Sequence, residues 1–348
     1  PGAAIFGKNG GGKSNVIRAF WLAVQFIRNA QRTQHEKATI PVIPFALNDY
    51  SASEPTEFEF FYTLDGIKYW YAFSATKEKI VSESLYHAPK GQRAIVFLRK
   101  GQVFDFNTDK SRRNLIKEAV AENQLFFSVA CTMNDADCSR AMKWFREKVF
   151  FSRDYSDIPR QLLEYSNDAH MLKAISDYAK AADLGIEDMQ FEINSKEVQK
   201  DGSIPDDIPE SIKAALIQFM QTLSETSNNS EVRLKMGEVK ATSKHKGCNK
   251  NGESQLYSLD LEDESDGTQR LLDLLPMLFA IDKRNRSIYL VDEIDRSLHT
   301  KLSRYLLKLF LENSNDANCQ IIYTAHDVNL IDMNEFSQDE IWFVEKDE

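Results

Sequence analysis

The chain has 348 residues, enough for one large domain or two ordinary ones, and its formal net charge is −10. Hydrophobic residues make up 42% and charged residues 28%, a composition typical of a globular protein with a substantial core. The acidic balance excludes a protein that coats nucleic acid over its whole surface, and no apolar run approaches the ~20 residues of a membrane span.

The N-terminal 30 residues predict a strand, a glycine-rich turn and a helix. Ala3–Phe6 is a short apolar run, and apolar residues recur at helical spacing from Ser14 to Ala30. Between them, Gly7–Ser14 fits G-x-x-x-x-G-K-[ST] in full. Glycines let such a loop turn successive N–H groups toward one anion at a helix N-terminus. We therefore predict a nucleotide phosphate-binding loop made by Gly7, Asn9, Gly10, Gly11, Gly12, Lys13, Ser14 and Asn15.

Two residues of this loop are predicted to have chemical roles. The Lys13 ammonium can reach the β- and γ-phosphates, and the Ser14 hydroxyl can ligate Mg²⁺. A chance glycine-rich turn would lack the strand before it and the helix after it. The pattern therefore indicates nucleotide binding.

The hydrophobic pattern changes twice in the middle of the chain. Alternating apolar residues and turn signals predict a meander of antiparallel strands at Glu57–Phe60, Ile67–Phe73, Lys79–Tyr86, Ala94–Phe97 and Val103–Phe106. Apolar residues at helical spacing then predict helices at Asn114–Val120, Ala141–Val149 and Ala169–Ala182. The stretch from Asn194 to Gly252 is polar, and we expect an insertion with one amphipathic helix at Ile212–Leu223.

Strand and helix alternate after Tyr257, which predicts a parallel sheet covered by helices. The predicted elements are a helix at Gly267–Ile281, a strand at Ser287–Val291, a helix at Leu298–Glu312, and strands at Gln320–Tyr323 and Ile341–Val344. Nucleotide-type α/β sequence thus lies at both ends of the chain. We predict one split head, built from residues 1–108 and 255–348, with a helical lobe or insertion at 109–254.

The strand at Ser287–Val291 ends in two carboxylates, Asp292 and Glu293. Asp292, at the carboxyl end of a central strand, is placed to hold Mg²⁺ through water, and Glu293 can polarise an attacking water. Alone, this acidic pair would be interpreted as a cap of the next helix, which is a common surface feature. Together with the phosphate loop, it predicts ATP hydrolysis.

The segment Glu264–Arg270 resembles the signature motif of ABC-type ATPases, in the Ser-x-Gly-x-x-Arg form of the SMC, RecF and OLD branches. The resemblance implies that Ser265 and Gly267 contact the γ-phosphate held by another subunit. A small hydroxyl, a glycine and a helix dipole suit an anion site. Taken alone, Ser265 would be an ordinary helix cap.

Two further segments resemble the same family. Asp295 matches the D-loop that crosses the dimer interface, and His326, after the strand Gln320–Tyr323, matches the switch histidine. The resemblance implies that a neutral His326 imidazole hydrogen-bonds the γ-phosphate or the attacking water. The Q-loop glutamine is unassigned, with Gln124 as a candidate that the motifs do not align.

The resemblance covers most of the chain, which is identified as a member of the ABC-type AAA ATPases of the SMC, RecF and OLD branch. It is similar to the ATPase subunits of bacterial abortive-infection, or anti-phage, systems. This implies an α/β fold: an ABC-type P-loop ATPase head with a β-rich antiparallel subdomain and an inserted helical lobe. It also implies ATP and Mg²⁺ as ligands, a homodimer or higher oligomer, a separate toxin or nuclease effector, and no membrane partner.

Other functions stay open at this point. The same motifs fit a DNA-repair or recombination ATPase of the RecF or SMC type, and a nucleotide-gated scaffold with little hydrolysis. A basic run fits either a nucleic-acid or partner contact, or a solvated insertion tip: Arg233, Lys235, Lys240, Lys244, Lys246 and Lys250. The four cysteines, at 131, 138, 248 and 319, are too scattered for a disulfide framework or a zinc site and predict a reducing cytoplasm.

Overall fold

The computed structural model describes residues 2–29, 39–152, 168–182, 185–197, 235–279, 281, 286–331 and 336–346. The chain divides into two compact units. Unit 1 comprises residues 1–153, 281–295 and 307–348, and unit 2 comprises residues 154–280 and 296–306. The boundaries predicted at residues 108 and 254 rest on sequence pattern alone and stay a prediction.

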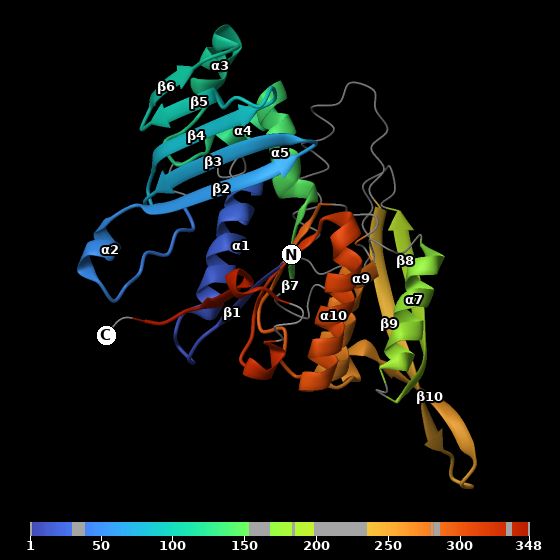
Figure 1. Ribbon diagram of the computed structural model, residues 1–348. Helices are drawn as coiled ribbons and strands as arrows, with labels where there is room; N and C mark the ends of the chain where they lie inside the picture. Colours follow the sequence, from blue (N-terminus) through green and yellow to red (C-terminus); the bar gives the residue numbers. More distant parts are fainter. Residues whose placement is uncertain are drawn as a thin grey trace. The chain divides into compact units, whose positions relative to one another are not determined.

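Unit 1 contains a five-stranded sheet in the order β13-β1-β12-β11-β7, in which every neighbouring pair is parallel (Figure 1). Its strands are β1 (Gly2–Phe6), β7 (Val149–Ser152), β11 (Ile288–Val291), β12 (Gln320–Thr324) and β13 (Ile341–Phe343). The short 3-10 helices η4 (Val328–Leu330) and η5 (Gln338–Glu340) lie between β12 and β13. This confirms the parallel sheet predicted from alternating strand and helix.

The second sheet of unit 1 is the predicted antiparallel meander, in the order β2-β3-β4-β5-β6. Its strands are β2 (Thr56–Leu64), β3 (Ile67–Ala75), β4 (Ile80–Ala88), β5 (Ala94–Lys100) and β6 (Val103–Phe106), and the short helix α2 (Asp49–Ser53) precedes them. Asp65 and Gly66 join β2 to β3 with φ of 50° and 77°. Positive φ at both central residues is the two-residue hairpin geometry that matches strand twist.

Unit 1 also contains the helices α1 (Lys13–Asn29), α3 (Lys110–Lys117), α4 (Phe126–Thr132) and α5 (Ala136–Glu147), and residues 307–317 of α10 (Thr300–Ala317). One hydrophobic cluster joins Ile17 of α1, Phe60 of β2, Phe145 of α5 and Leu290 of β11. Arg28, in the last turn of α1, donates to the carbonyls of Phe145 (2.7 Å) and Val149 (2.7 Å). The helix that follows the phosphate loop is therefore fixed to both α5 and β7.

The predicted helix at Asn114–Val120 begins four residues earlier than expected, and the one predicted at Ala141–Val149 begins at Ala136. The second difference has a local cause. The Asp135 side chain accepts a hydrogen bond from the Cys138 N–H (3.0 Å) and caps the helix there. Val149 instead opens a strand beside β11.

Asp135 also belongs to a buried ion-pair network. Arg113, 1% exposed, donates to Asp135 (2.9 Å and 3.1 Å) and to Asp137 (2.8 Å). Burial acts to raise the pKa of Asp135, but the hydrogen bonds from Arg113 and from the Cys138 N–H outweigh it and lower that pKa. The ionised carboxylate is therefore the form that the fold stabilises.

We expect Asp135→Asn to lower the free energy of unfolding by about 3–5 kcal/mol, because the buried guanidinium of Arg113 then loses the negative charge that balances it. A carboxyl whose pKa is lower in the folded than in the unfolded protein stabilises the fold at pH values above its unfolded pKa of ~3.9. This stabilisation is lost as the pH falls through the lower pKa of the folded state. Urea unfolding at pH 7 and at pH 3 should therefore show a smaller difference from wild type in acid. The exposed-site control Asp105→Asn should stay within about 0.5 kcal/mol at both values. Equal losses in the two variants would contradict the assignment.

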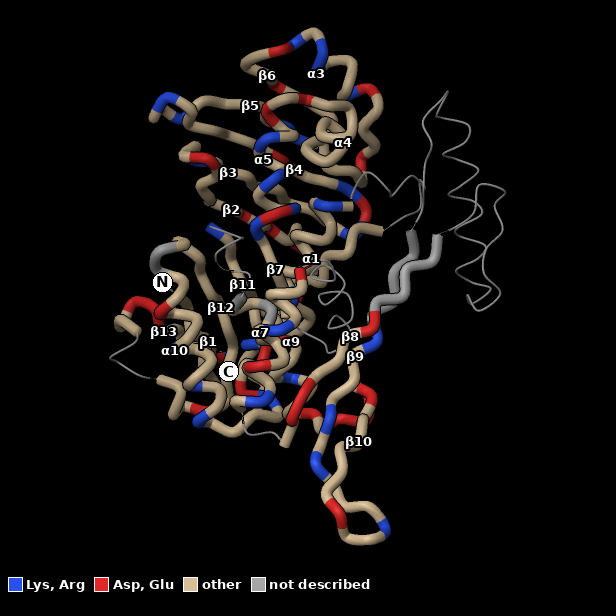
Figure 2. Tube along the Cα trace, turned by 90° about the vertical axis from the view of Figure 1, so that its right-hand side faces the viewer, with Lys and Arg blue, Asp and Glu red and all other residues tan. Residues whose placement is uncertain are grey.

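Unit 2 contains a three-stranded antiparallel sheet in the order β10-β9-β8 (Figure 2). Its described elements are α7 (Ala169–Ala181), β8 (Ile186–Glu197), β9 (Lys235–Cys248), β10 (Ser254–Asp260), η3 (Leu261–Asp263) and α9 (Asp266–Phe279), and α10 (Thr300–Ala317) begins in this unit. The helices predicted at 169–182 and 267–281 are confirmed. The helix predicted at Ile212–Leu223 lies outside the described residues.

Two long paired strands lie where the sequence pattern predicted none: β9 falls within the polar stretch predicted as an insertion, and β8 ends at its start. Strands β8 and β9 pair from Ile186 and His245 to Glu197 and Lys235. Lys240 lies 3.1 Å from Asp260, and Lys246 lies 2.6 Å from Glu187. These two lysines of the basic run therefore pair with acids of the same unit, and Arg233 lies outside the described residues.

Candidate functional site

The phosphate loop has a backbone that glycine permits and other residues do not. Gly10 and Gly12 have φ of 79° and 107°, in the region that L side chains rarely adopt. A Cβ on Gly7 would lie 2.2 Å from the Val344 carbonyl oxygen, and one on Gly11 would lie 3.0 Å from the same atom. The loop thus packs directly against the backbone after β13. Its glycines are required both by conformation and by space.

Lys13 is the first residue of α1 and is 5% exposed. Its ammonium donates to the carbonyl of Gly7 (2.7 Å) and to that of Lys8 (3.3 Å). The lysine is therefore held across its own loop, at the N-terminus of a helix. A buried cation at this position favours an anionic ligand in the loop.

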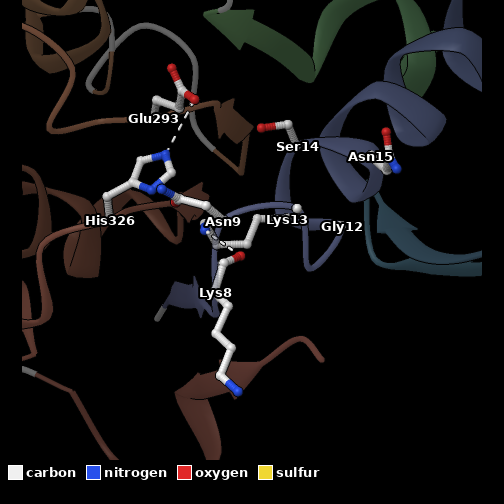
Figure 3. A pocket seen from close by; sticks show the side chains of 9 residues that line it. Lys8, Asn9, Gly12, Lys13, Ser14, Asn15, Glu293 and His326 are labelled. Carbon is white, nitrogen blue, oxygen red and sulfur yellow. Dashed lines mark hydrogen bonds and ion pairs between the residues drawn. The ribbon is translucent and has the colours of Figure 1, made fainter. Parts of the chain in front are cut away.

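A cavity of about 310 Å³ opens over the loop (Figure 3). Its lining combines loop residues with two side chains from other parts of unit 1: Lys8, Asn9, Gly10, Gly12, Lys13, Ser14, Asn15, Glu293 and His326. Glu293 follows β11 and His326 follows β12, which are neighbouring parallel strands, so their carboxyl ends meet at one edge of the sheet. Lys8 lines the cavity but was not predicted as a site residue. Gly7 and Gly11 lie in the loop but do not line the cavity.

Thr324, the last residue of β12, connects the carboxylate of Asp292 with the backbone of Glu293. Its hydroxyl donates to Asp292 Oδ1 (2.7 Å) and accepts the N–H of Glu293 (2.8 Å). Glu293 has φ of 48°, an unusual backbone conformation for a glutamate, of the kind that gathers at functional sites. Its Oε1 lies 3.3 Å from Nε2 of His326. Thr324 was not predicted as a site residue, although it stands in the same segment as the histidine.

Asp295 holds the loop that carries His326. Its Oδ2 accepts the backbone N–H groups of His326 (2.8 Å) and Asp327 (2.7 Å). This contact lies within one chain and orients the histidine. The predicted role of Asp295 at a dimer interface stays a prediction.

The predicted signature residues lie in unit 2. The Ser265 hydroxyl accepts the N–H of Thr268 (3.2 Å) and lies 3.0 Å from its hydroxyl, so it caps α9. Gly267 is also required by space, because a Cβ there would lie 2.8 Å from the Ser297 carbonyl oxygen. The segment therefore presents a capping hydroxyl and a glycine at a helix N-terminus.

Gln124, the Q-loop candidate, is buried and does not line the cavity. Its side-chain oxygen accepts the Ala121 N–H (3.1 Å), and its carbonyl accepts Arg99 Nη1 (2.6 Å). It stabilises a turn before α4. Among the described residues no group of three or more His, Cys, Asp or Glu side chains could hold a metal. Magnesium needs fewer protein ligands, since it keeps waters and binds substrate phosphates.

Residues 3–332 match the family described as "AAA domain, putative AbiEii toxin, Type IV TA system". The chain belongs to this family. Membership confirms the resemblance predicted from the motifs, an AAA-type ATPase similar to those of abortive-infection systems. A search of curated proteins found no matching relative. No described helix is long and apolar enough to cross a membrane.

Similar solved structures include three ATPase heads or cassettes. An SMC head bound to the C-terminal winged-helix domain of ScpA has 16% identity and a TM-score of 0.43, over 94% of this chain and 83% of that one. The SMC head domain from Thermotoga maritima has 13% identity and a TM-score of 0.35, over 96% and 82%. A dimeric ATP-binding cassette bound to ADP and phosphate has 10% identity and a TM-score of 0.30, over 98% and 80%.

Proposed function

We propose that this chain hydrolyses ATP as a homodimer, in which each complete site joins the phosphate loop of one copy to Ser265 and Gly267 of the other. The observation that carries the proposal is the cavity of unit 1, which is lined by the phosphate loop together with Glu293 and His326. Family membership supports nucleotide binding. A capped helix N-terminus with a hydroxyl and a glycine is suited to a second phosphate contact.

The residues present fit ATP with Mg²⁺. The loop has glycines at positions where a Cβ would collide or be strained, and Lys13 supplies a buried cation. The Ser14 hydroxyl and the Asp292 carboxylate would hold Mg²⁺, which when bound supplies charge neutralisation for the phosphates. Glu293 would polarise the attacking water, and His326 would orient Glu293 or contact the γ-phosphate. We assign Asn9, Asn15 and Asp295 to nucleotide binding on the motif resemblance.

We further propose that ATP binding and hydrolysis control a separate toxin or nuclease effector, or a nucleic acid, in anti-phage defence within the cytosol. The family description, which names a toxin system, supports the first part. The four cysteines are all free, which suits a reducing compartment. The alternative of a DNA-repair ATPase would be favoured if the purified protein bound duplex DNA with a steep salt dependence. A nucleotide-gated scaffold would be favoured if turnover stayed low with every partner.

A shared site predicts that specific ATPase activity rises with protein concentration, because a single copy lacks the second phosphate contact. We expect Ser265→Arg to keep nucleotide affinity, to prevent ATP-dependent association and to lower turnover ~100-fold. Turnover and molar mass by light scattering, each measured across a concentration series with and without Mg-ATP, test this. Constant specific activity in a protein that stays monomeric would overturn the proposal.

A further inference from the structure

The residue before the signature serine is tied into the sheet of unit 2. Ser243 and His245 lie two positions apart on β9, so both side chains project from the same face of the strand. The Ser243 hydroxyl donates to Glu264 Oε1, and His245 Nε2 lies 2.6 Å from the same oxygen. Ser243 is 1% exposed and Glu264 is 9% exposed. One carboxylate oxygen therefore receives two contacts from β9 in a largely buried position.

These three residue types also occur in hydrolytic triads, but the geometry here is different. In a triad the two ring nitrogens of the histidine have different partners: one contacts the acid and the other contacts the nucleophile. Here the same nitrogen, His245 Nε2, lies 3.1 Å from the Ser243 hydroxyl as well as 2.6 Å from Glu264. Ser243 is also buried, so a substrate could not reach its hydroxyl. The cluster is therefore an anchor for Glu264.

Contacts of the Glu264 main chain extend this anchor to the signature motif. Its N–H donates to the Leu261 carbonyl (3.3 Å), and its carbonyl accepts Gln269 Nε2 (3.0 Å). The next residue is Ser265, whose hydroxyl caps α9. The peptide that leads into Ser265 is thus fixed by the sheet on one side and by α9 on the other.

We propose that Glu264 is a positioning residue, which β9 holds through Ser243 and His245 so that Ser265 is correctly placed for the nucleotide of the second copy. This rests on the proposed function of Ser265. Because β9 is the central strand of its sheet, a ligand that displaces β8–β10 would also displace Ser265. Misplacing a group that contacts the reacting phosphate by about 1 Å can slow an enzyme ~100-fold.

The test compares Glu264→Ala with the matched control Glu262→Ala. Glu262 lies two residues earlier, on η3, and its side chain is exposed. We expect Glu264→Ala to lower kcat by ~10- to 100-fold while the Kd for ATP changes less than about twofold, because the phosphate loop is untouched. Glu262→Ala should keep both values near wild type. Glu264→Gln keeps one carbonyl oxygen for Ser243 and His245 to contact, so kcat should recover at least in part.

Three outcomes separate the hypotheses, provided that each variant binds ATP and so is folded. If Ser265→Arg loses turnover but Glu264→Ala resembles Glu262→Ala, the positioning role is wrong and the shared site stands. If Glu264→Ala loses thermal stability with an unchanged kcat below its melting temperature, the cluster is structural and the inference is overturned. If neither Ser265→Arg nor Glu264→Ala changes turnover, the proposed function itself fails.

Discussion

Replacing Glu293 with glutamine is expected to lower ATP turnover by ~100- to 10,000-fold while leaving ATP bound in a stable dimer. Loss of a positioned general base has an effect of this size, whereas the amide keeps the shape of the side chain and removes only its basicity. The Glu293 carboxylate lies in the cavity with Lys13 and Ser14, and His326 Nε2 lies 3.3 Å from it. Phosphate release measures turnover, and light scattering with Mg-ATP measures the dimer.

The control for this variant is Glu59→Gln, which makes the same change on an exposed position of β2. It should hydrolyse ATP at the wild-type rate and should not trap a dimer. Unchanged hydrolysis by Glu293→Gln would remove Glu293 from its assigned role. Loss of turnover without trapping would instead show that closure needs the charged carboxylate.

The second large effect is expected at Lys13, where substitution by alanine should weaken ATP binding by about thirtyfold or more. Truncating one partner of a buried, hydrogen-bonded charge pair costs at least about 2 kcal/mol, which corresponds to that factor in Kd. The fold should survive, because the Lys13 ammonium contacts the carbonyls of its own loop. Titration with a fluorescent ATP analogue and a thermal melt of the nucleotide-free protein measure the two quantities.

Lys8 provides a matched comparison from the same loop. It also lines the cavity, but its side chain points away from Ser14 and Glu293 (Figure 3). Lys8→Ala should therefore weaken ATP binding much less than Lys13→Ala. Undiminished ATP binding by Lys13→Ala would refute the phosphate-loop assignment.

Features that depend on local pattern could be predicted from the order of the residues. The motif Gly7–Ser14 requires a particular backbone, and the structure has the positive φ values of Gly10 and Gly12 that such a loop needs. Alternating apolar residues indicated the meander β2–β6, because a half-buried strand shows its two faces in the sequence. The motif resemblance assigned the carboxylates after β11 and the histidine after β12, and the structure brings them together because these neighbouring parallel strands end at a common edge.

The side chains that hold these groups in place could be identified only in the folded chain. Thr324 contacts the backbone of Glu293 and the side chain of Asp292, which lie more than 30 positions away in the sequence. Ser243 contacts Glu264 across 21 positions. No local pattern encodes such pairings. Strands β8 and β9 were not predicted. Polar side chains occupy much of β9, which obscures the alternation that marks a half-buried strand, whereas Met189, Phe191 and Ile193 of β8 do alternate with polar residues and could have indicated that strand. The phosphate loop could therefore be predicted from residue types. The contacts that would position Glu293 and Ser265 form only when distant segments of the chain fold together.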